Sequence, residues 1–144
     1  MSPHLRLAFA ISPAFGIALC FALCATARSD VVAVVSAKSA ITALNKSQVA
    51  DIFLGKVTSY PGGGAATPID QEGRLIRAQF YAMLVDQSPA QIKAYWSKII
   101  FTGRGRPPQE VADSAEMKKI LAVYPGAVGY IDSHDVDASV RVLF

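Results

Sequence analysis

A run of β-branched and small residues, "VVAVV" from Val31 to Val35, limits the folds open to this chain more than any other stretch. Valine favours extended backbone, and a strand without polar alternation has no face suited to water. Such a strand is typical of a parallel or mixed sheet that is covered on both faces. The run therefore predicts an α/β fold in which helices flank a mixed sheet.

Helix and strand signals alternate along the rest of the chain. Predicted helices span residues 47–54, with Ser47 as the N-cap and Gly55 just past the end, residues 73–85, residues 89–102, begun by Ser88-Pro89, and residues 114–124, with Ser114 as the cap. Further strands are predicted over residues 67–69, 127–131 and 140–144. The stretch "GRGRPP", residues 103–108, is predicted to be irregular. This alternation is typical of one α/β domain.

The first residues have the layout of a secretory signal. A short basic start that includes Arg6 precedes an almost unbroken apolar run, Leu7 to Leu23, and small residues follow up to Ala27. This layout predicts signal-peptide cleavage after Ala27. An uncleaved membrane anchor is the alternative, because the run is only slightly shorter than a bilayer requires. Lipid attachment at Cys20 or Cys24 is a weaker one, because leucine precedes each cysteine.

Both cysteines fall inside that leader, so residues 28–144 contain none. A disulfide, a thiolate nucleophile and a cysteine metal site are therefore excluded from the mature chain. A domain without disulfides depends on an ordinary hydrophobic core, and residues 28–144 suffice for one compact domain but not for two lobes. We expect a signal peptide over residues 1–27, a single α/β domain over residues 28–144, and a periplasmic or secreted location.

The charge pattern argues against nucleic acid as a partner. The formal net charge is +3, basic residues form no runs, and the aromatic residues fall at helical spacing. Positive charge is clustered only at Arg74 with Arg77 and at Arg104 with Arg106.

The stretch "TPIDQEGRLIRAQFY", residues 67–81, reads as a strand, a turn with one glycine, and an amphipathic helix. Unpaired N–H groups at a helix N-terminus carry partial positive charge, so this order predicts an anion site. In the alternative interpretation the arginines are solvated or pair with Asp70 and Glu72, and these acids serve helix capping and charge balance.

Arg104 and Arg106 form a second candidate site. They are separated by glycine and followed by two prolines, which stiffen the loop and lower the entropy cost of holding a partner. The same anion or a protein surface could bind there, and a solvated loop is the alternative.

Metal binding and catalysis find little support. His134 beside Asp132, Asp135 and Asp137 could form half of a metal site, although one histidine among acids in a loop is more often simply exposed. No nucleophile, metalloprotease, P-loop or dinucleotide pattern is present. We therefore expect no metal, no cofactor and no enzymatic activity.

Four segments together resemble the periplasmic phosphate-binding protein of ABC transporters, and more closely the small one-domain proteins called phosphate-binding-protein-like. They are "SQVADIFLGKVTSYPGG" (47–63), "PIDQEGRLIRAQFY" (68–81), "YWSKIIFTGRGRPP" (95–108) and "PGAVGYID" (125–132). The resemblance implies one lobe of the type II periplasmic binding-protein class, in which ligand lies in a cleft between two lobes.

The phosphate-holding turn of that family departs from its pattern here. Glu72 and Gly73 match the family's acid and glycine, but Asp70 stands where an arginine would be, and Arg74 and Ile76 replace a serine and a threonine. Phosphate is held by many charge-assisted hydrogen bonds, so these changes should weaken its binding. The guanidinium groups of Arg74 and Arg77 could compensate, since their planar fork suits phosphate, sulfate or carboxylate.

The sequence thus predicts an exported solute-binding-like protein that holds phosphate or a related small anion for uptake or sensing. The predicted anion-binding residues are Gln71, Gly73, Arg74, Arg77, Arg104 and Arg106. An ABC permease or another periplasmic protein is a predicted partner, and a homodimer could rebuild a closed site. The alternative is an interaction module that kept the fold and lost its ligand, because a half cleft leaves ligand exposed to water.

Overall fold

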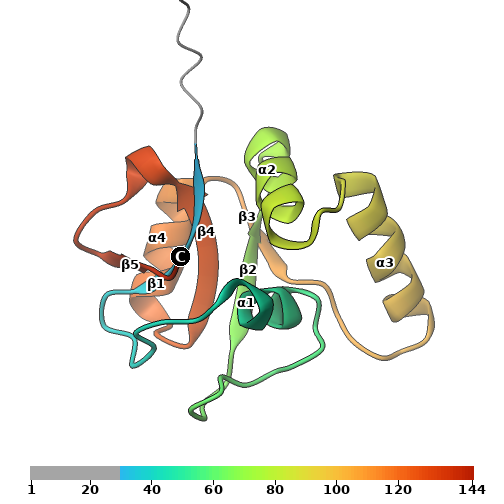
Figure 1. Cartoon of the computed structure of the whole chain (residues 1–144), viewed down its shortest axis with the longest axis horizontal. Helices are drawn as coiled ribbons and strands as arrows, with labels where there is room; N and C mark the ends of the chain where they lie inside the picture. The colour runs from blue at the N-terminus through green and yellow to red at the C-terminus, as the bar shows by residue number, and fades with distance from the viewer. Residues whose placement is uncertain (1–29) are drawn as a thin grey trace, which may run out of the picture.

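The computed structural model describes residues 30–144, so the predicted leader lies outside the described residues. The elements in chain order are β1 (Val31–Ser36), α1 (Lys46–Phe53), β2 (Thr67–Gln71), α2 (Arg74–Val85), α3 (Pro89–Phe101), β3 (Gln109–Val111), α4 (Ser114–Val123), β4 (Ala127–Asp132), the short 3-10 helix η1 (Ser133–Asp135) and β5 (Val140–Val142). Figure 1 shows their arrangement.

The strands form one mixed sheet in the order β3-β2-β4-β1-β5. β2 pairs in parallel with β3 and with β4, whereas β1 is antiparallel to β4 and to β5. A mixed sheet flanked by helices confirms the fold class predicted from the sequence.

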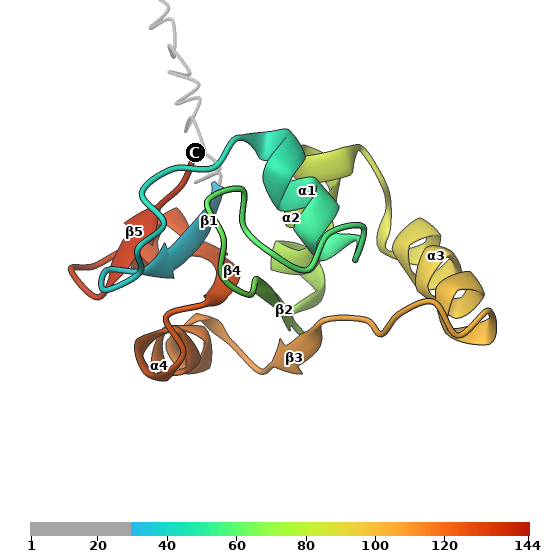
Figure 2. The ribbon, with the colours of Figure 1, turned by 90° about the horizontal axis from the view of Figure 1, so that it is seen from below.

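The valine run is buried on both faces of the sheet. Ala33 and Val35 belong to an apolar cluster formed with α1, α2 and α3, whereas Val34, on the opposite face, packs in a second cluster with α4. Figure 2 shows α1 and α2 on one side of the sheet and α4 on the other, with α3 standing beyond α2 at the end of the molecule. The continuous apolar run therefore gave the correct expectation, because each face of β1 is covered by a helix layer.

Two predicted helix caps are wrong by one or two residues. Asn45, not Ser47, caps α1: its side chain accepts from the Gln48 N–H at 2.9 Å, and the Gln48 side chain accepts from the Asn45 N–H at 2.9 Å. Asp113, not Ser114, caps α4 by accepting from the Glu116 N–H at 2.9 Å. In both helices an Asn or Asp upstream supplies the capping oxygen, so the helix begins earlier than the serine predicts.

The start of α3 is confirmed as predicted, with Ser88 as the N-cap and proline at the first helical position. Strand β2 is longer than predicted, because it continues through Asp70 and Gln71. Strand β3 was not predicted, and the final strand ends at Val142 rather than at Phe144. Within residues 30–144 no helix is both long and apolar enough to cross a membrane.

Candidate functional site

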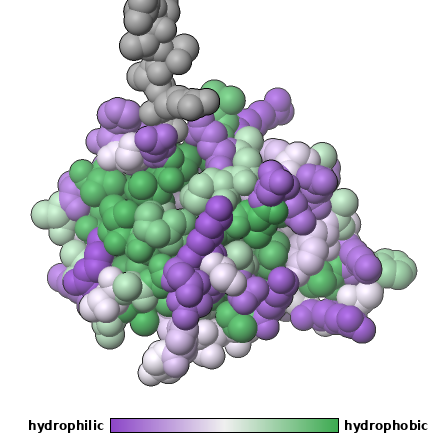
Figure 3. All heavy atoms as spheres, in the orientation of Figure 1, coloured by the Kyte–Doolittle hydropathy of each residue, from purple (hydrophilic) through white to green (hydrophobic). Residues whose placement is uncertain are grey.

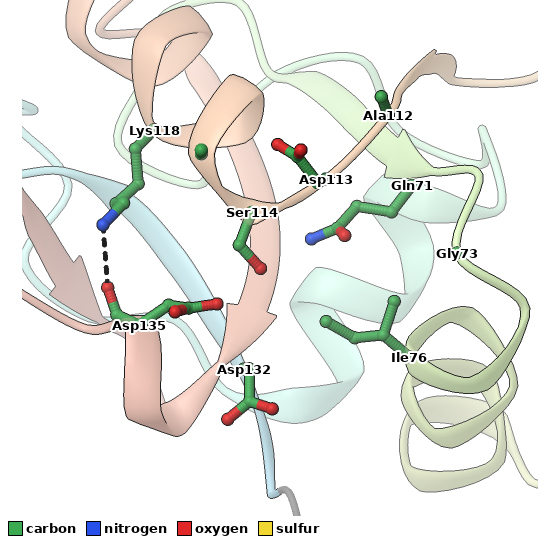
Figure 4. A pocket seen from close by; sticks show the side chains of 10 residues that line it. Gln71, Gly73, Ile76, Ala112, Asp113, Ser114, Lys118, Asp132 and Asp135 are labelled. Atoms are coloured by element: carbon green, nitrogen blue, oxygen red, sulfur yellow. Dashed lines mark hydrogen bonds between the residues drawn. The ribbon is translucent and has the colours of Figure 1, made fainter.

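A pocket lies where the parallel strands β2, β3 and β4 end. Its volume is about 490 Å³. Its lining comprises Gln71, Gly73, Ile76, Ala112, Asp113, Ser114, Ala115, Lys118, Asp132 and Asp135 (Figure 4). Ligands of open α/β sheets bind outside the carboxyl ends of the strands, so this is the position where a site is expected.

The start of α2 forms one wall of this pocket. Its N-cap is Gly73, which makes no side-chain capping hydrogen bond, and the first turn contains no acidic residue. The first intrahelical bond there runs from the Arg77 N–H to the Gly73 carbonyl at 3.0 Å. The N–H groups of Arg74, Leu75 and Ile76 precede it and lack an intrahelical acceptor. The other α-helices of residues 30–144 each have a side-chain cap. Among the α-helices of this range, α2 is therefore the one whose first N–H groups have no acceptor on an N-cap side chain.

Gln71 is the most deeply buried polar residue of the pocket, with 2% of its surface exposed. Its Nε2 donates to the Tyr130 carbonyl at 2.7 Å, which fixes the orientation of the amide. Figure 4 shows the side chain directed from the end of β2 toward Ser114. The amide can therefore offer its remaining oxygen to a ligand donor in the pocket.

A buried carboxylate lies directly behind this pocket. Asp70 is 1% exposed and accepts from the hydroxyl groups of Tyr130 and Tyr81, the latter at 3.0 Å. The Gln71 N–H also donates to it at 2.9 Å, and Arg77 Nη2 lies 3.1 Å from its second oxygen. Burial, followed by the charge of Asp70 and the hydrogen bond to it, raises the pKa of both tyrosines well above the usual value. The predicted helix-capping role of Asp70 is therefore wrong, since Asp70 belongs to a strand, whereas the alternative that an arginine pairs with it is confirmed for Arg77.

Arg77 is held by two carboxylates. Its Nη1 donates to Glu110 Oε1 at 2.7 Å while Nη2 contacts Asp70. Burial by itself would lower the pKa of Arg77, but the two carboxylates outweigh it and raise the pKa. Both terminal nitrogens of the guanidinium therefore already contact a carboxylate.

The six predicted anion-binding residues do not converge on one place. Gln71 and Gly73 line the pocket at the strand ends, and Arg74 is exposed in the first turn of α2 beside them. Arg77 lines a different groove, alongside α3, whereas Arg104 and Arg106 line a third hollow at the loop after α3. The sequence grouped the arginines into two pairs. The fold places Arg104 and Arg106 in one hollow, and it places Arg77 in a different groove from the pocket beside Arg74.

The wall of the pocket opposite α2 contains Asp113, Asp132 and Asp135, and the sequence did not show that these acids face the start of α2. Asp113 caps α4, and Lys118 donates to the Asp135 carbonyl at 3.0 Å and to Asp137 Oδ2 at 2.8 Å. Hydrogen bonds from Lys118 and from Ser139 hold the pKa of the Asp137 carboxyl well below its usual range. The sequence singled out Asp132 and Asp135 only beside His134, and the spacing from Asp113 to Glu116 is that of a helix start.

His134, which was considered as half of a metal site but not predicted as one, contacts an acid. Its Nδ1 lies 2.8 Å from Asp132 Oδ1, and the side chain is exposed. Within residues 30–144 no group of three histidine, cysteine or acidic side chains is arranged to hold a metal ion.

Comparison with known proteins gives matches among solved structures alone, since no family model and no curated protein matches the chain. A Clostridium perfringens structure, named as a phosphate ABC transporter substrate-binding protein and containing bound phosphate, superposes with a TM-score of 0.63 at 20% identity over 79% of this chain. An ABC-type phosphate transport receptor from Vibrio cholerae gives 0.59 at 19% identity, and PstS from Borrelia burgdorferi gives 0.58 at 12%, each over 79% of the chain.

These similarities establish the fold predicted from the sequence, that of a periplasmic-binding-protein lobe. The chain spans less than half the length of the proteins it matches, with 44% of the first, 45% of the second and 46% of the third covered.

Proposed function

We propose that this protein is an exported, non-enzymatic, solute-binding-like protein that captures a small anion for uptake or sensing, with phosphate as the first candidate. The observation that carries the proposal is the uncapped start of α2 at Gly73, located at the edge of the sheet where parallel strands end. Aligned peptide dipoles and unpaired N–H groups make such a helix start favourable for an anion.

The surroundings of Gly73 support this assignment. Arg74 is exposed in the first turn of α2 and can add a charge-assisted hydrogen bond. Gln71 can orient a hydroxyl group of a protonated phosphate through its side-chain oxygen. Structures with this fold include a protein solved with bound phosphate, which makes phosphate the first anion to test.

The acidic wall sets the expected strength of binding. Asp113, Asp132 and Asp135 line the same pocket as Gly73. Their charges oppose a dianion, and a single wall of protein buries little of a ligand. We therefore expect weak capture with a preference for singly charged anions.

A second candidate function is an interaction module with an ABC permease, another periplasmic protein or a second copy of the chain. The observation that favours it is Leu75, which is 82% exposed in the first turn of α2. Figure 3 also shows apolar side chains gathered on the β1 and β5 side of the molecule, where the chain ends. Contiguous apolar surface of this kind marks contact sites in soluble proteins.

Calorimetric titration with phosphate, sulfate and acetate tests the anion proposal through a matched pair of variants. Gly73→Asp supplies a capping carboxylate that competes with any bound anion, whereas Gly73→Ala adds the same Cβ without charge. That Cβ would lie 3.0 Å from Ile76 Cγ2, so both variants share the same small steric cost. We expect Gly73→Asp to bind phosphate at least about tenfold more weakly than Gly73→Ala, which corresponds to 1.4 kcal/mol.

The stability of the same variants provides the internal control. A cap at the start of a helix contributes about 0.5 to 2 kcal/mol, so Gly73→Asp should unfold at a higher denaturant concentration than Gly73→Ala. Loss of binding together with higher stability would show that the helix start holds the anion. Absence of heat with all three anions, or equal affinity of the two variants, would reject the proposal and favour the interaction module.

A further inference from the structure

A second groove, distinct from the pocket at the strand ends, lies between α3 and the loop that leads into β3. Its volume is about 480 Å³, and its lining includes Arg77, Lys93, Trp96, Ile100, Pro107 and Glu110. Ile100 and Pro107 also line the neighbouring hollow that contains Arg104 and Arg106. The two hollows therefore share part of their lining beside α3, the helix that stands at the end of the molecule in Figures 1 and 2.

Two residues that line this groove each have a buried N–H donor without an acceptor. Trp96 is 5% exposed, and neither its indole Nε1 nor the Nε of Arg77 has a hydrogen-bond partner anywhere in residues 30–144. The one other buried side-chain atom in this condition, Gln87 Oε1, is not part of the groove lining. An N–H group buried without an acceptor is rare in native proteins, and two at one groove point to acceptors supplied from outside the chain.

The charges around these donors favour a ligand with a single negative charge. Nη2 and Nη1 of Arg77 each contact a carboxylate, Asp70 and Glu110 respectively, so Nε is the one guanidinium nitrogen without a partner among the described residues. The Lys93 ammonium makes no ion pair with any described residue and adds one uncompensated positive charge. Because Glu110 is part of the same lining, a dianion such as phosphate would meet repulsion as well as attraction.

The remaining lining is apolar apart from Ser97, whose hydroxyl donates to the Lys93 carbonyl at 2.9 Å. Pro89, Ala90, Ile100 and Pro107 face the groove, and Ile100 is 54% exposed to solvent. Covering this surface with an apolar group would gain roughly 25 cal/mol for each Å² removed from water. A ligand that satisfies both parts of the groove must therefore combine a charged acceptor with an apolar body.

We propose that this groove binds a small monocarboxylate with an aliphatic or aromatic body. Its oxygen atoms accept hydrogen bonds from Trp96 Nε1 and Arg77 Nε and face the Lys93 ammonium, while its body packs on Ile100 and Pro107. The site is separate from the start of α2, so it neither requires nor excludes the anion capture proposed there.

The chain supplies its own probe, because Trp96 is the only tryptophan. Titration with sodium hexanoate or sodium benzoate should change tryptophan emission saturably. In an amide-correlation NMR spectrum the single indole N–H signal should move downfield as it gains an acceptor. Hexylammonium chloride, which has the same apolar body and the opposite charge, should leave that signal in place, and sodium phosphate should do the same.

Variants on one helix separate the groove from general charge attraction. Lys93→Gln removes the groove cation, whereas Lys98→Gln removes an exposed cation of α3 that does not line the groove. We expect Lys93→Gln to weaken hexanoate binding at least about fivefold and Lys98→Gln to leave it within about twofold, since surface charges that do not contact a ligand contribute little. Trp96→Phe, followed by calorimetry, should weaken binding at least as much as Lys93→Gln.

The results also separate this proposal from the one at α2. Gly73→Asp should leave hexanoate binding unchanged, whereas Lys93→Gln should leave phosphate binding unchanged. An unmoved indole signal in saturating hexanoate, equal losses in Lys93→Gln and Lys98→Gln, or equal shifts with hexylammonium would each overturn the carboxylate site. None of these outcomes bears on phosphate binding at Gly73.

Discussion

Arg77 connects two polar regions that differ in whether their buried groups are satisfied. On the inner side, the Asp70 carboxylate accepts from Tyr81, Tyr130 and the Gln71 N–H, and Arg77 Nη2 completes its environment. On the outer side, Arg77 Nε and Trp96 Nε1 have no acceptor among the described residues. Buried polar groups that are fully paired stabilise one structure, whereas unpaired ones cost stability until something binds. The inner region should therefore control folding and the outer groove should control binding.

Removal of the Asp70 carboxylate should have the largest effect on folding. Asp70→Ala leaves two buried hydroxyl groups without an acceptor and leaves Arg77 with Glu110 alone. We expect a loss on the order of 3 to 5 kcal/mol in the free energy of unfolding, measured by urea denaturation.

Asp70→Asn serves as the control, because it retains one acceptor oxygen while it removes the charge and replaces the other oxygen by an NH2 group. It should lose clearly less stability than Asp70→Ala and remains measurable if the alanine variant fails to fold. If both variants unfolded at the urea concentration of the wild type, the inner network would not contribute to folding as the comparison requires.

Removal of one hydroxyl group should have an intermediate effect. Tyr130→Phe keeps the ring, which stacks on Phe80 with centroids 3.8 Å apart, and removes the hydroxyl that donates to Asp70 and accepts from the Gln71 N–H, which keeps its bond to Asp70. A hydrogen bond to a charged group contributes about 1.5 to 3 kcal/mol, so we expect a loss in that range by urea denaturation.

The pH dependence of stability distinguishes this hydrogen bond from a packing defect. The raised pKa of Tyr130 keeps its phenol protonated in the folded state at a pH where the unfolded chain has begun to ionise near pH 10. Its contribution is therefore present below pH 10 and is lost as the pH rises above that value. Tyr130→Phe should lose less stability than the wild type between pH 9 and pH 11, and identical pH profiles would contradict the assignment.

The sequence predicted most of the fold because its signals there are local. The run from Val31 to Val35 indicated a strand covered on both faces, and Ser88 with Pro89 marked the start of α3. The caps at Ser47 and Ser114 were wrong because Asn45 and Asp113 compete for the same donors a residue or two upstream. A single sequence gives no measure of which of two adjacent capping residues prevails.

The candidate site was less predictable because its partners are distant along the chain. Asp70 was interpreted as an acid that serves helix capping and charge balance, since nothing near it in sequence shows that the Tyr130 hydroxyl reaches it. The outer groove combines side chains from α2, from α3, from the loop before β3 and from β3 itself. The helical spacing of the aromatic residues does not show that the Trp96 indole lacks an acceptor. Charge alone grouped Arg77 with Arg74. In the fold, Arg77 contacts the buried Asp70 of the inner network, and its Nε has no acceptor among the described residues.

The smallest change in stability is expected for a substitution of Glu110, which contacts Arg77 and lines the outer groove. Glu110 contacts Arg77 Nη1 at 2.7 Å, but the two side chains are 42% and 27% exposed. Exposed ion pairs contribute about 0 to 1 kcal/mol, so Glu110→Gln should change the free energy of unfolding by no more than that. The same substitution removes a negative charge from the groove lining, so hexanoate affinity should rise by about twofold to fivefold, a gain of less than 1.4 kcal/mol. Urea denaturation and tryptophan titration of this one variant measure both quantities, and a large loss of stability without a gain in affinity would place Glu110 in the inner network instead.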